Sequence, residues 1–432
     1  MQTVPSWPRP DVPALPPGPP VSLYDSASGS LRRVHPDSGE ALLYVCGITP
    51  YDATHLGHAA TYLAFDTLVR AWLSAGLRVR AAQNITDVDD PLLERARSTG
   101  RDWRRIALEQ SDLFRSDMTA LRVVPPDAYV RVQDVVEETG EAVRRMLAEG
   151  TAYLVPVPAD ARPAASSPDA HDVYFDIAAA ERSGVWRLGS AARTPAAERE
   201  TLFREFGGDP DRPGKRGALD PLLWRAAREG EPAWPSPAGE GRPGWHVECA
   251  VIATGALGPT VTVQAGGRDL RFPHHDLSAG HAAALTGEPF AGVFAHAGLV
   301  AYRGEKMSKS LGNLVLVSRL REAGADPAAI RLAVLSHHYR EDWEWRDEEL
   351  RIAEARLEQW RTAAAEAPQA GPGEEEPSST VLALQAALAD DLDTPAAIAA
   401  VDEWAARTGG AREAGDVPRA VDALLGIDPS AD

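Results

Sequence analysis

The fold of this chain is decided by residues 42–58, which read LLYVCGITPYDATHLGH. The apolar run 42–45 predicts a short buried strand, and the turn-rich segment after it, with Gly47 and Pro50, predicts a loop. From His55 onward the sequence has helical periodicity. A strand, a loop and a helix start in this order mark the ligand-binding edge of an open α/β sheet, because strand carboxyl ends and helix amino ends meet there.

The composition is that of a globular protein with two or three domains. The chain has 432 residues, of which 25% are charged and 44% apolar. No window approaches the roughly 18 uninterrupted apolar residues of a membrane span, and the N-terminus has no apolar signal core. The first twenty residues instead contain eight prolines, which are typical either of an extended arm or of a disordered tail. We expect a cytoplasmic protein that does not bind a membrane.

The formal net charge of the chain is −19. Binding nucleic acid through its phosphates needs a locally basic surface. The acidic total therefore makes a nucleic-acid partner unexpected.

The order of the elements predicts an α/β fold. A helix expected over 58–75 joins the first strand to a second over 77–85, so a right-handed βαβ unit is the natural topology. Helices and a strand expected within about 100–220 interrupt this alternation and predict an insertion, and the last strand is expected over 293–300. The predicted division is a Pro-rich arm over 1–40, a Rossmann-like catalytic domain over 41–300, a lysine-bearing loop and connecting subdomain over 301–345, and a C-terminal helical domain over 346–432 with a linker over 364–379.

Two short motifs are suited to a nucleotide. The first is HLGH at 55–58, where helix amides and imidazole donors can hold a phosphate chain, although two histidines near a glycine are common. The second is KMSKS at 306–310, a polar loop whose ammonium and hydroxyl groups suit the charge of a departing pyrophosphate. The chain has only three lysines, Lys215, Lys306 and Lys309, so a pair within four positions indicates a selected role.

The two cysteines, Cys46 and Cys249, indicate a metal site rather than a disulfide. Cys46 ends the first predicted strand, Cys249 ends the run WHVEC from 245, and the run FPHH covers 272–275. Two thiolates and one imidazole fill three positions of a tetrahedral zinc site and leave the fourth open, and thiolates favour zinc over Mg²⁺ or Ca²⁺. On spacing alone His246, His274 and His275 all remain candidates for the imidazole.

An open fourth position suits a substrate that carries a thiol. A pocket that separates cysteine from serine by packing gains little, whereas a bond from zinc to sulfur rejects the hydroxyl strongly. Coordination would also hold the thiol deprotonated and leave the chemistry to the carboxylate of the substrate.

Together these motifs resemble those of one family. HLGH and KMSKS on a parallel sheet are the signature pair of class I aminoacyl-tRNA synthetases. CGIT at 46–49, GWHVEC at 244–249 and FPHH at 272–275 resemble cysteinyl-tRNA synthetases, and still more the related cysteine ligases of mycothiol biosynthesis. The resemblance covers nearly the whole chain and implies a class I synthetase Rossmann-like parallel sheet with an inserted subdomain and a C-terminal helical domain.

The resemblance implies a role for each matching position. Zinc would be held by Cys46, Cys249 and His274, and Mg²⁺ would accompany ATP. The catalytic groups would be His55, His58, Lys306 and Lys309. The implied ATP-binding residues are His55, Leu56, Gly57, His58, Lys306, Met307, Ser308, Lys309 and Ser310. The implied cysteinyl-adenylate residues are Cys46, Gly47, Ile48, Thr49, Thr61, Asn84, Ile85, Thr86, Trp245, Gly267, Arg268, Asp269 and Val300.

Several departures from the synthetases favour the ligases. Ser278 stands four positions after His274, where the synthetases usually supply a fourth ligand, a glutamate. The runs PYDAT at 50–54 and DPL at 90–92 are ligase-like, and the short acidic segment 311–432 is smaller than an anticodon-recognition region. Two matches to the ligases are imperfect: they commonly carry serine at the position of Arg268, and EFGGDP at 205–210 differs from their usual RGGDP.

The reaction that the resemblance implies is the ATP-dependent ligation of L-cysteine to the amine of 1D-myo-inositol 2-amino-2-deoxy-alpha-D-glucopyranoside. It would pass through cysteinyl-AMP and release AMP and pyrophosphate. The alternative within the family is a cysteinyl-tRNA synthetase, and the alternative outside it is a catalytically silent nucleotide- or thiol-binding module. We expect a monomer.

Overall fold

A computed structural model describes residues 1–51, 54–158, 161, 163–164, 170–307, 312–367, 376–407 and 415–431. Its centre is a five-stranded sheet in the order β11-β10-β3-β4-β5, in which every neighbouring pair is parallel. The chain builds outward from β3 to β4 and β5, then returns to the other side of β3 with β10 and β11. The direction therefore reverses between β3 and β10, where open α/β sheets bind ligands. These strands are β3 (Glu40–Val45), β4 (Arg78–Ile85), β5 (Ala128–Arg131), β10 (Val261–Gly267) and β11 (Ala291–Ala297).

The predicted βαβ unit is confirmed. Helix α1 (Leu56–Ser74) joins β3 to its parallel neighbour β4. The helix begins where the His55 side chain accepts a hydrogen bond from the Gly57 amide, and the chain turns away at Gly76, whose φ is +82°. The motif at 55–58 thus lies at a helix amino end, directly above the sheet edge.

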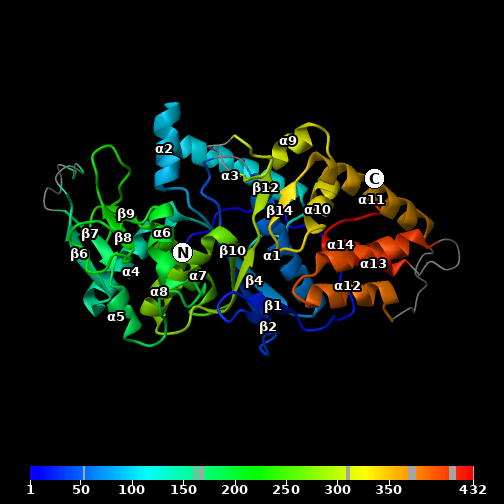
Figure 1. The fold of residues 1–432 in the computed structure, drawn as a ribbon, viewed down its shortest axis with the longest axis horizontal. Helices are drawn as coiled ribbons and strands as arrows, with labels where there is room; N and C mark the ends of the chain where they lie inside the picture. Colours follow the sequence, from blue (N-terminus) through cyan, green and yellow to red (C-terminus); the bar gives the residue numbers. More distant parts are fainter. Residues whose placement is uncertain are drawn as a thin grey trace.

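The two faces of the sheet are covered by different helices (Figure 1). Leu43 and Val45 of β3 pack with α1, while Tyr44 between them packs with α7 (Trp245–Leu257) and α8 (Asp276–Thr286), as the alternation along a strand requires. The outer side of α1 is covered by C-terminal helices, so α1 is buried on nearly all sides. Those that pack against α1 are α10 (Pro327–Leu335), α12 (Ser379–Ala389) and α14 (Asp416–Leu425), and the other two C-terminal helices are α11 (Asp347–Glu366) and α13 (Thr394–Ala406).

The insertion is an antiparallel sheet at one end of the elongated molecule, but the boundaries predicted for it, about 100–220, are wrong. Helix α3 (Trp103–Ala120) leads to β5, which pairs with β4 and belongs to the parallel sheet. Four residues are too few to show a periodicity, so this strand was missed. The inserted elements follow it, namely α4 (Val136–Glu149), β6 (Ala152–Pro156), β7 (His171–Phe175), α5 (Ile177–Glu181), α6 (Ala196–Glu205), β8 (Leu222–Ala226) and β9 (Gly241–Pro243).

Three further stretches differ from the prediction. Helix α2 (Asp90–Thr99) begins where only a polar loop was expected, because Asp89 caps it. The strand expected over 293–300 is not the last, since β12 (Val300–Tyr302) forms a small sheet with later strands. Of the predicted linker, 364–366 belong to α11 and 368–375 lie outside the described residues. The remaining elements here are β13 (Glu305–Lys306), α9 (Val317–Glu322) and β14 (Trp343–Trp345).

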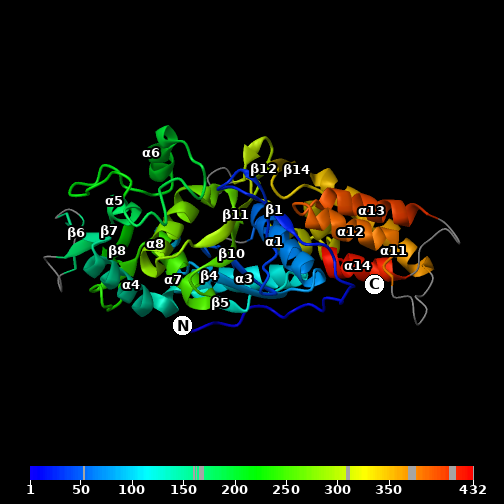
Figure 2. The same ribbon diagram turned by 90° about the horizontal axis from the view of Figure 1, so that it is seen from below.

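The Pro-rich N-terminus is an extended arm, one of the two structures left open by its sequence. Figure 2 shows it running beneath α3 toward the C-terminal helices. Trp7 is buried and donates its indole N–H to the Val123 carbonyl at 2.7 Å, and the Gly18 amide donates to Ser74 at the end of α1 at 2.8 Å. The hairpin β1 (Ser22–Asp25) and β2 (Ser30–Arg33) lies within the arm predicted over 1–40 and was not predicted. Among the described residues, no helix is long and apolar enough to cross a membrane.

A buried ionic cluster ties α1 to the C-terminal helices. The Asp66 carboxylate accepts hydrogen bonds from Arg70 on the same helix at 2.8 Å and from Arg331 on α10. Arg331 also donates to the Leu425 carbonyl on α14, and Arg70 donates to main-chain carbonyls of α14. Burial alone disfavours the charged carboxyl, but the two arginines outweigh burial and hold the pKa of Asp66 below its ordinary value.

Changing Asp66 to asparagine should therefore destabilise the protein by about 3–5 kcal/mol, because two buried guanidinium groups lose their counter-charge. The lowered pKa means that the contribution of Asp66 is complete above the unfolded-state pKa of about 4 and is lost as pH falls through the folded-state value. Urea unfolding at pH 7 and at pH 3 measures both effects. Glu141→Gln, which breaks an exposed pair with Arg144, is the matched control and should shift the midpoint far less. Equal shifts for the two variants would contradict this account.

Candidate active site

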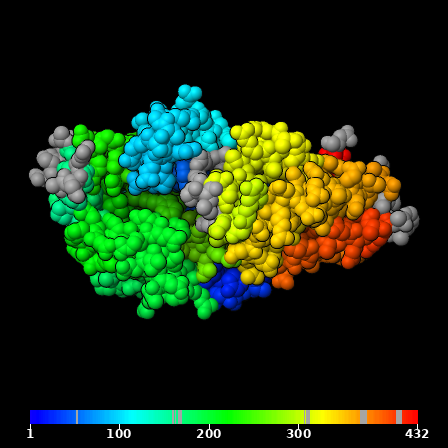
Figure 3. Space-filling view, turned by 45° about the horizontal axis from the view of Figure 1, so that its top comes forward, coloured from blue at the N-terminus to red at the C-terminus, as the bar shows by residue number. Residues whose placement is uncertain are grey.

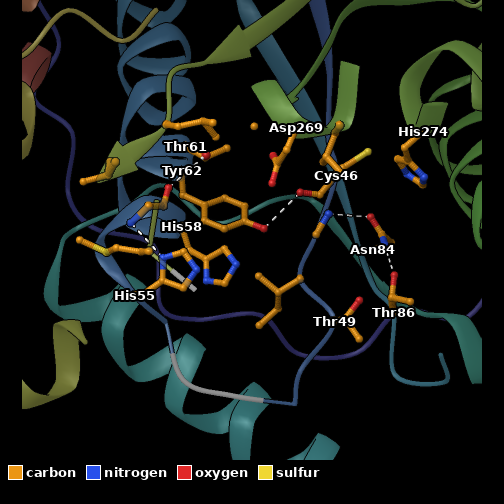
Figure 4. A pocket seen from close by; sticks show the side chains of 18 of the residues that line it. Cys46, Thr49, His55, His58, Thr61, Tyr62, Asn84, Thr86, Asp269 and His274 are labelled. Atoms are coloured by element: carbon orange, nitrogen blue, oxygen red, sulfur yellow. Dashed lines mark hydrogen bonds between the residues drawn. The ribbon is translucent and has the colours of Figure 1, made fainter. Parts of the chain in front are cut away.

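A cavity of about 490 Å³ opens at the carboxyl ends of β3, β4, β10 and β11. Figure 4 shows its lining, with Cys46 and His274 at one end and His55 and His58 at the other. Besides the metal candidates, fourteen residues that the sequence analysis assigned to the site line the cavity. These fourteen are Gly47, Ile48, Thr49, His55, Gly57, His58, Thr61, Asn84, Thr86, Trp245, Gly267, Asp269, Val300 and Met307.

The ends of β3 and β4 are fixed to each other by Asn84. Its side-chain carbonyl accepts hydrogen bonds from the Gly47 amide at 2.7 Å and from the Tyr44 hydroxyl at 3.1 Å, and its amide donates to the Thr86 hydroxyl at 2.9 Å. A Cβ on Gly47 would lie 1.7 Å from the Asn84 main-chain oxygen, so only glycine permits this approach. The loop that starts at Cys46 is held by these contacts.

One end of the cavity is formed by the amino end of α1. The His55 and His58 rings stack with centroids 3.9 Å apart and an angle of 27° between their planes. His55 accepts the Gly57 amide through Nδ1 at 3.1 Å, and a Cβ on Gly57 would lie 2.9 Å from the His55 ring. A helix amino end that carries two imidazoles can stabilise a phosphate chain.

The opposite end of the cavity is a group of three metal-binding side chains. Cys46 follows β3, Cys249 lies on α7 and His274 precedes α8. The two Sγ atoms are 4.0 Å apart, and His274 Nε2 is 3.2 Å from the Cys249 sulfur. One ligand atom from each residue lies within 4.8 Å of the other two, and all three residues are buried. Two thiols and an imidazole that converge in this way can hold a metal ion.

The structure separates the three candidate histidines. His246 contacts His274 instead of the thiols, with their Nδ1 atoms 3.0 Å apart, and is thus placed to orient the His274 ring. His275 contacts His296 on β11, with Nδ1 2.8 Å from Nε2, and takes part in the core. Ser278 donates its hydroxyl to the His246 carbonyl at 3.0 Å. The side chain at the synthetase ligand position is therefore turned to the backbone.

Burial and neighbouring groups shift the pKa values of His274 and Cys249. Burial, together with neighbouring histidines, lowers the pKa of His274 well below its ordinary value, so the imidazole is neutral, the form that binds metals. A hydrogen bond with Cys46, followed by burial, raises the pKa of the Cys249 thiol. The Cys249 thiol therefore becomes a thiolate only when a cation lies beside it.

Some residues assigned from the sequence are not part of the cavity wall. Leu56 is buried in the core and Ile85 lies behind the wall. Arg268 turns outward, donating to Asp342 and to the Arg340 carbonyl, so its departure from the usual serine leaves the cavity lining unchanged. Met307 lines the cavity and Lys306 ends β13, paired with Ala301 on β12, whereas Ser308, Lys309 and Ser310 lie outside the described residues.

The cavity also contains residues that the sequence did not single out. Tyr62 donates its hydroxyl to the Cys46 carbonyl at 3.1 Å and lies one helical turn after His58, a spacing that would have revealed it. Gly298 and Leu299 follow β11, another strand carboxyl end, and the remaining additions are Tyr51, Leu270 and Leu314.

Comparisons with known proteins agree with this geometry. Residues 33–355 match the model of the tRNA synthetases class I (C) catalytic domain. The fold is similar to that of Mycobacterium tuberculosis methionyl-tRNA synthetase in complex with methionyl-adenylate, with a TM-score of 0.60, 18% identity, and 90% of this chain and 92% of that chain covered. The chain belongs to the class I tRNA synthetase (C) family.

Closer relatives define its place within that family. The L-cysteine:1D-myo-inositol 2-amino-2-deoxy-alpha-D-glucopyranoside ligase of Clavibacter michiganensis subsp. michiganensis is 58% identical, over 98% of each chain. The ligase of the same name from Micrococcus luteus is 54% identical, over 98% of this chain and 99% of its own. The chain thus belongs with these ligases, which confirms the resemblance drawn from the motifs.

Changing Cys249 to alanine should abolish binding of one divalent transition-metal ion, because it removes one of two thiol donors. Changing His246 to alanine should weaken binding by roughly 10–100-fold, because the three donors remain but the orienting contact to His274 is lost. Metal content after dialysis and competition with a chelator measure both effects. The matched control, Ser278→Ala, should bind metal like the unmodified protein. Stoichiometric metal in Cys249→Ala would show that the site is elsewhere.

Proposed function

We propose that this chain ligates L-cysteine to the amine of 1D-myo-inositol 2-amino-2-deoxy-alpha-D-glucopyranoside in two steps, with ATP as the energy source. The observation that carries the proposal is the cavity itself, which joins a thiol-and-imidazole metal group to a histidine pair at a helix amino end. The names of relatives 58% and 54% identical over nearly the whole chain support the acceptor.

Zinc fits the metal group best. Soft thiolate donors with a neutral imidazole favour it over Mg²⁺ or Ca²⁺, and Cys46, Cys249 and His274 would be its three protein ligands. Bound zinc would hold the thiol of the substrate as a thiolate and reject serine. Trp245, whose ring stacks on His274 at 4.3 Å, would cover the substrate next to this site.

The first step forms cysteinyl-AMP. The carboxylate of bound cysteine attacks the α-phosphorus of ATP, and pyrophosphate leaves. His55, His58 and the amides of α1 would stabilise the charge that grows on the phosphates. Lys306 and Lys309 remain predicted partners of the leaving pyrophosphate, and Mg²⁺ would accompany ATP.

The second step forms the amide. The amine of the acceptor attacks the activated carbonyl, and AMP leaves. Gly47, Thr49 and Asn84 would hold the acyl group, since they line the cavity wall between Cys46 and the end of β4.

The cysteinyl-tRNA synthetase alternative has less support. The side chain of Ser278 is hydrogen bonded to the backbone and does not supply a fourth ligand. The C-terminal helices α10, α12 and α14 pack against α1, so those faces are not available to a tRNA. A monomeric state and a cytoplasmic location stay predictions.

The proposal is tested by the acceptor that releases AMP from a mixture of protein, ATP and L-cysteine. Addition of the aminosugar–inositol should raise AMP release by at least about 100-fold over the mixture without acceptor, and tRNA should not. Mass spectrometry should find the cysteine amide, and L-serine in place of cysteine should give no product. Stimulation by tRNA and not by the aminosugar would establish the synthetase instead. An absence of cysteine-dependent exchange between ATP and pyrophosphate would favour a silent binding module.

A further inference from the structure

A cluster of charged side chains lies beside the cavity and has no part in the steps described above. We define the α2–β9 cluster as Asp89, Asp90, Glu231, Arg242 and Glu248. Asp89 and Asp90 lie at the start of α2, Arg242 lies on β9, and Glu248 lies on α7. The cluster thus joins three elements around one edge of the cavity.

The exposure of the acidic side chains in the cluster decreases from the surface inward. The Asp90 side chain is 54% exposed and pairs with Arg242, which also contacts Glu231 at 3.3 Å. Glu231 in turn accepts a two-pronged contact from Arg225, with both distances 3.0 Å. Glu248, at the inner end, is 1% exposed. Solvent therefore reaches the outer carboxylate but not the inner one.

Two buried polar atoms of the cluster have no hydrogen-bond partner in the part of the chain that the structure describes. They are Oε2 of Glu248 and Nε of Arg242. Burial, and next the charge of Asp89, raise the pKa of Glu248 well above its ordinary value, while Arg242 acts in the opposite direction, so the Glu248 carboxyl lies near both residues. A buried acceptor and a buried donor without partners are costly. They indicate a ligand that both accepts and donates hydrogen bonds.

The cluster adjoins the part of the cavity where the acyl group of the adenylate would lie. Thr49 and Thr86 line the cavity, the Thr86 amide donates to the Ile48 carbonyl at 3.1 Å, and Asp89 follows Thr86 by three positions. Trp245, another lining residue, precedes Glu248 by three positions on α7. Figure 3 shows a hollow between the surface of α2 and α3 and the inserted subdomain, the two sides that supply Asp90 and Arg242. An acceptor entering by this hollow would reach the acyl group.

We propose that the α2–β9 cluster binds the aminosugar acceptor and that Asp89 accepts a proton from its ammonium group. This inference rests on the proposed function. Asp89, Asp90 and Glu231 face the two guanidinium groups of Arg225 and Arg242, an excess of negative charge that favours a cation. Carboxylates accept hydrogen bonds from sugar hydroxyls, and Arg242 donates to them.

The proton transfer completes the second step. The ammonium group of the acceptor gives one proton to Asp89 and becomes a nucleophilic amine. Its nitrogen forms a bond to the acyl carbon, the bond from that carbon to the phosphate oxygen breaks, and the electron pair leaves with AMP. The nitrogen then loses its second proton to solvent, which gives the neutral amide.

The surroundings of Asp89 suit this role. Burial, and next the charge of Asp90, raise the pKa of Asp89 to about 6, while Arg242 and the Thr49 hydroxyl act in the opposite direction. Glu248 on α7 is the other acidic group that faces it. A base with a pKa near the working pH transfers protons most effectively.

Asp89→Asn tests the proposal through three rates: cysteine-dependent exchange between ATP and pyrophosphate, single-turnover transfer of cysteine to the aminosugar–inositol, and transfer to hydroxylamine. Hydroxylamine is neutral near pH 7 and needs no sugar site. The variant should transfer to the aminosugar at least about 100-fold more slowly at pH 7. Exchange and transfer to hydroxylamine should each stay within about threefold. Unmodified protein should show a break in aminosugar transfer near pH 6, below which the rate falls more steeply, and the residual transfer of the variant should show no break there.

Asp90→Asn provides an independent variant. The exposed Asp90 carboxylate contacts the acceptor without accepting the proton, so the variant should raise the KM for the aminosugar more than it lowers kcat. Asp112→Asn, the same change at an exposed pair on α3, is the control for all three rates. The proposal would be overturned if Asp89→Asn transferred cysteine to the aminosugar within threefold of the rate of the unmodified protein. It would also be overturned if transfer to hydroxylamine fell as much as transfer to the aminosugar. If unmodified protein exchanges pyrophosphate but transfers nothing to the aminosugar, the proposed function itself fails.

Discussion

The contact between Asn84 and Gly47 is the constraint on which the site depends. It fixes the end of β3 against the end of β4, with the Gly47 amide 2.7 Å from the Asn84 side-chain oxygen. Because glycine has no Cβ, the two backbones approach more closely than any other residue would allow. Cys46 before this contact and Thr49 after it are thereby placed on opposite sides of one fixed point.

The rest of the site is arranged around that point. The order of the sheet reverses between β3 and β10, so Cys46 and Gly267 leave neighbouring strand ends on either side of the cavity. Helix α1 starts from the same loop and carries His55 and His58. It is held from behind by the ionic cluster of Asp66 with the arginines of α1 and α10. The core thus sets the distance between Cys46 at one end of the cavity and the amino end of α1 at the other.

The sequence predicted those parts of the site that depend on local chemistry. The signature motifs, the first βαβ unit and the set of possible metal donors all follow from residue type and spacing. The sequence could not predict which histidine faces the thiols. His246, His274 and His275 have the same side chain, and their positions depend on how α7 and α8 pack. Strand β5 and helix α2 were missed because one is four residues long and the other begins within an acidic run that favours a loop. The closeness of Asp89 to Thr49 depends on the same tertiary packing.

The central claim is that the end of the cavity next to Cys46 selects a thiol by binding it to zinc. The zinc K-edge X-ray absorption spectrum of the zinc-loaded protein tests it most directly. Without substrate, two sulfur atoms should lie about 2.3 Å from the metal. L-Cysteine should raise that number to three, and L-serine should leave it at two. A spectrum that still shows two sulfur neighbours in saturating cysteine would contradict the account.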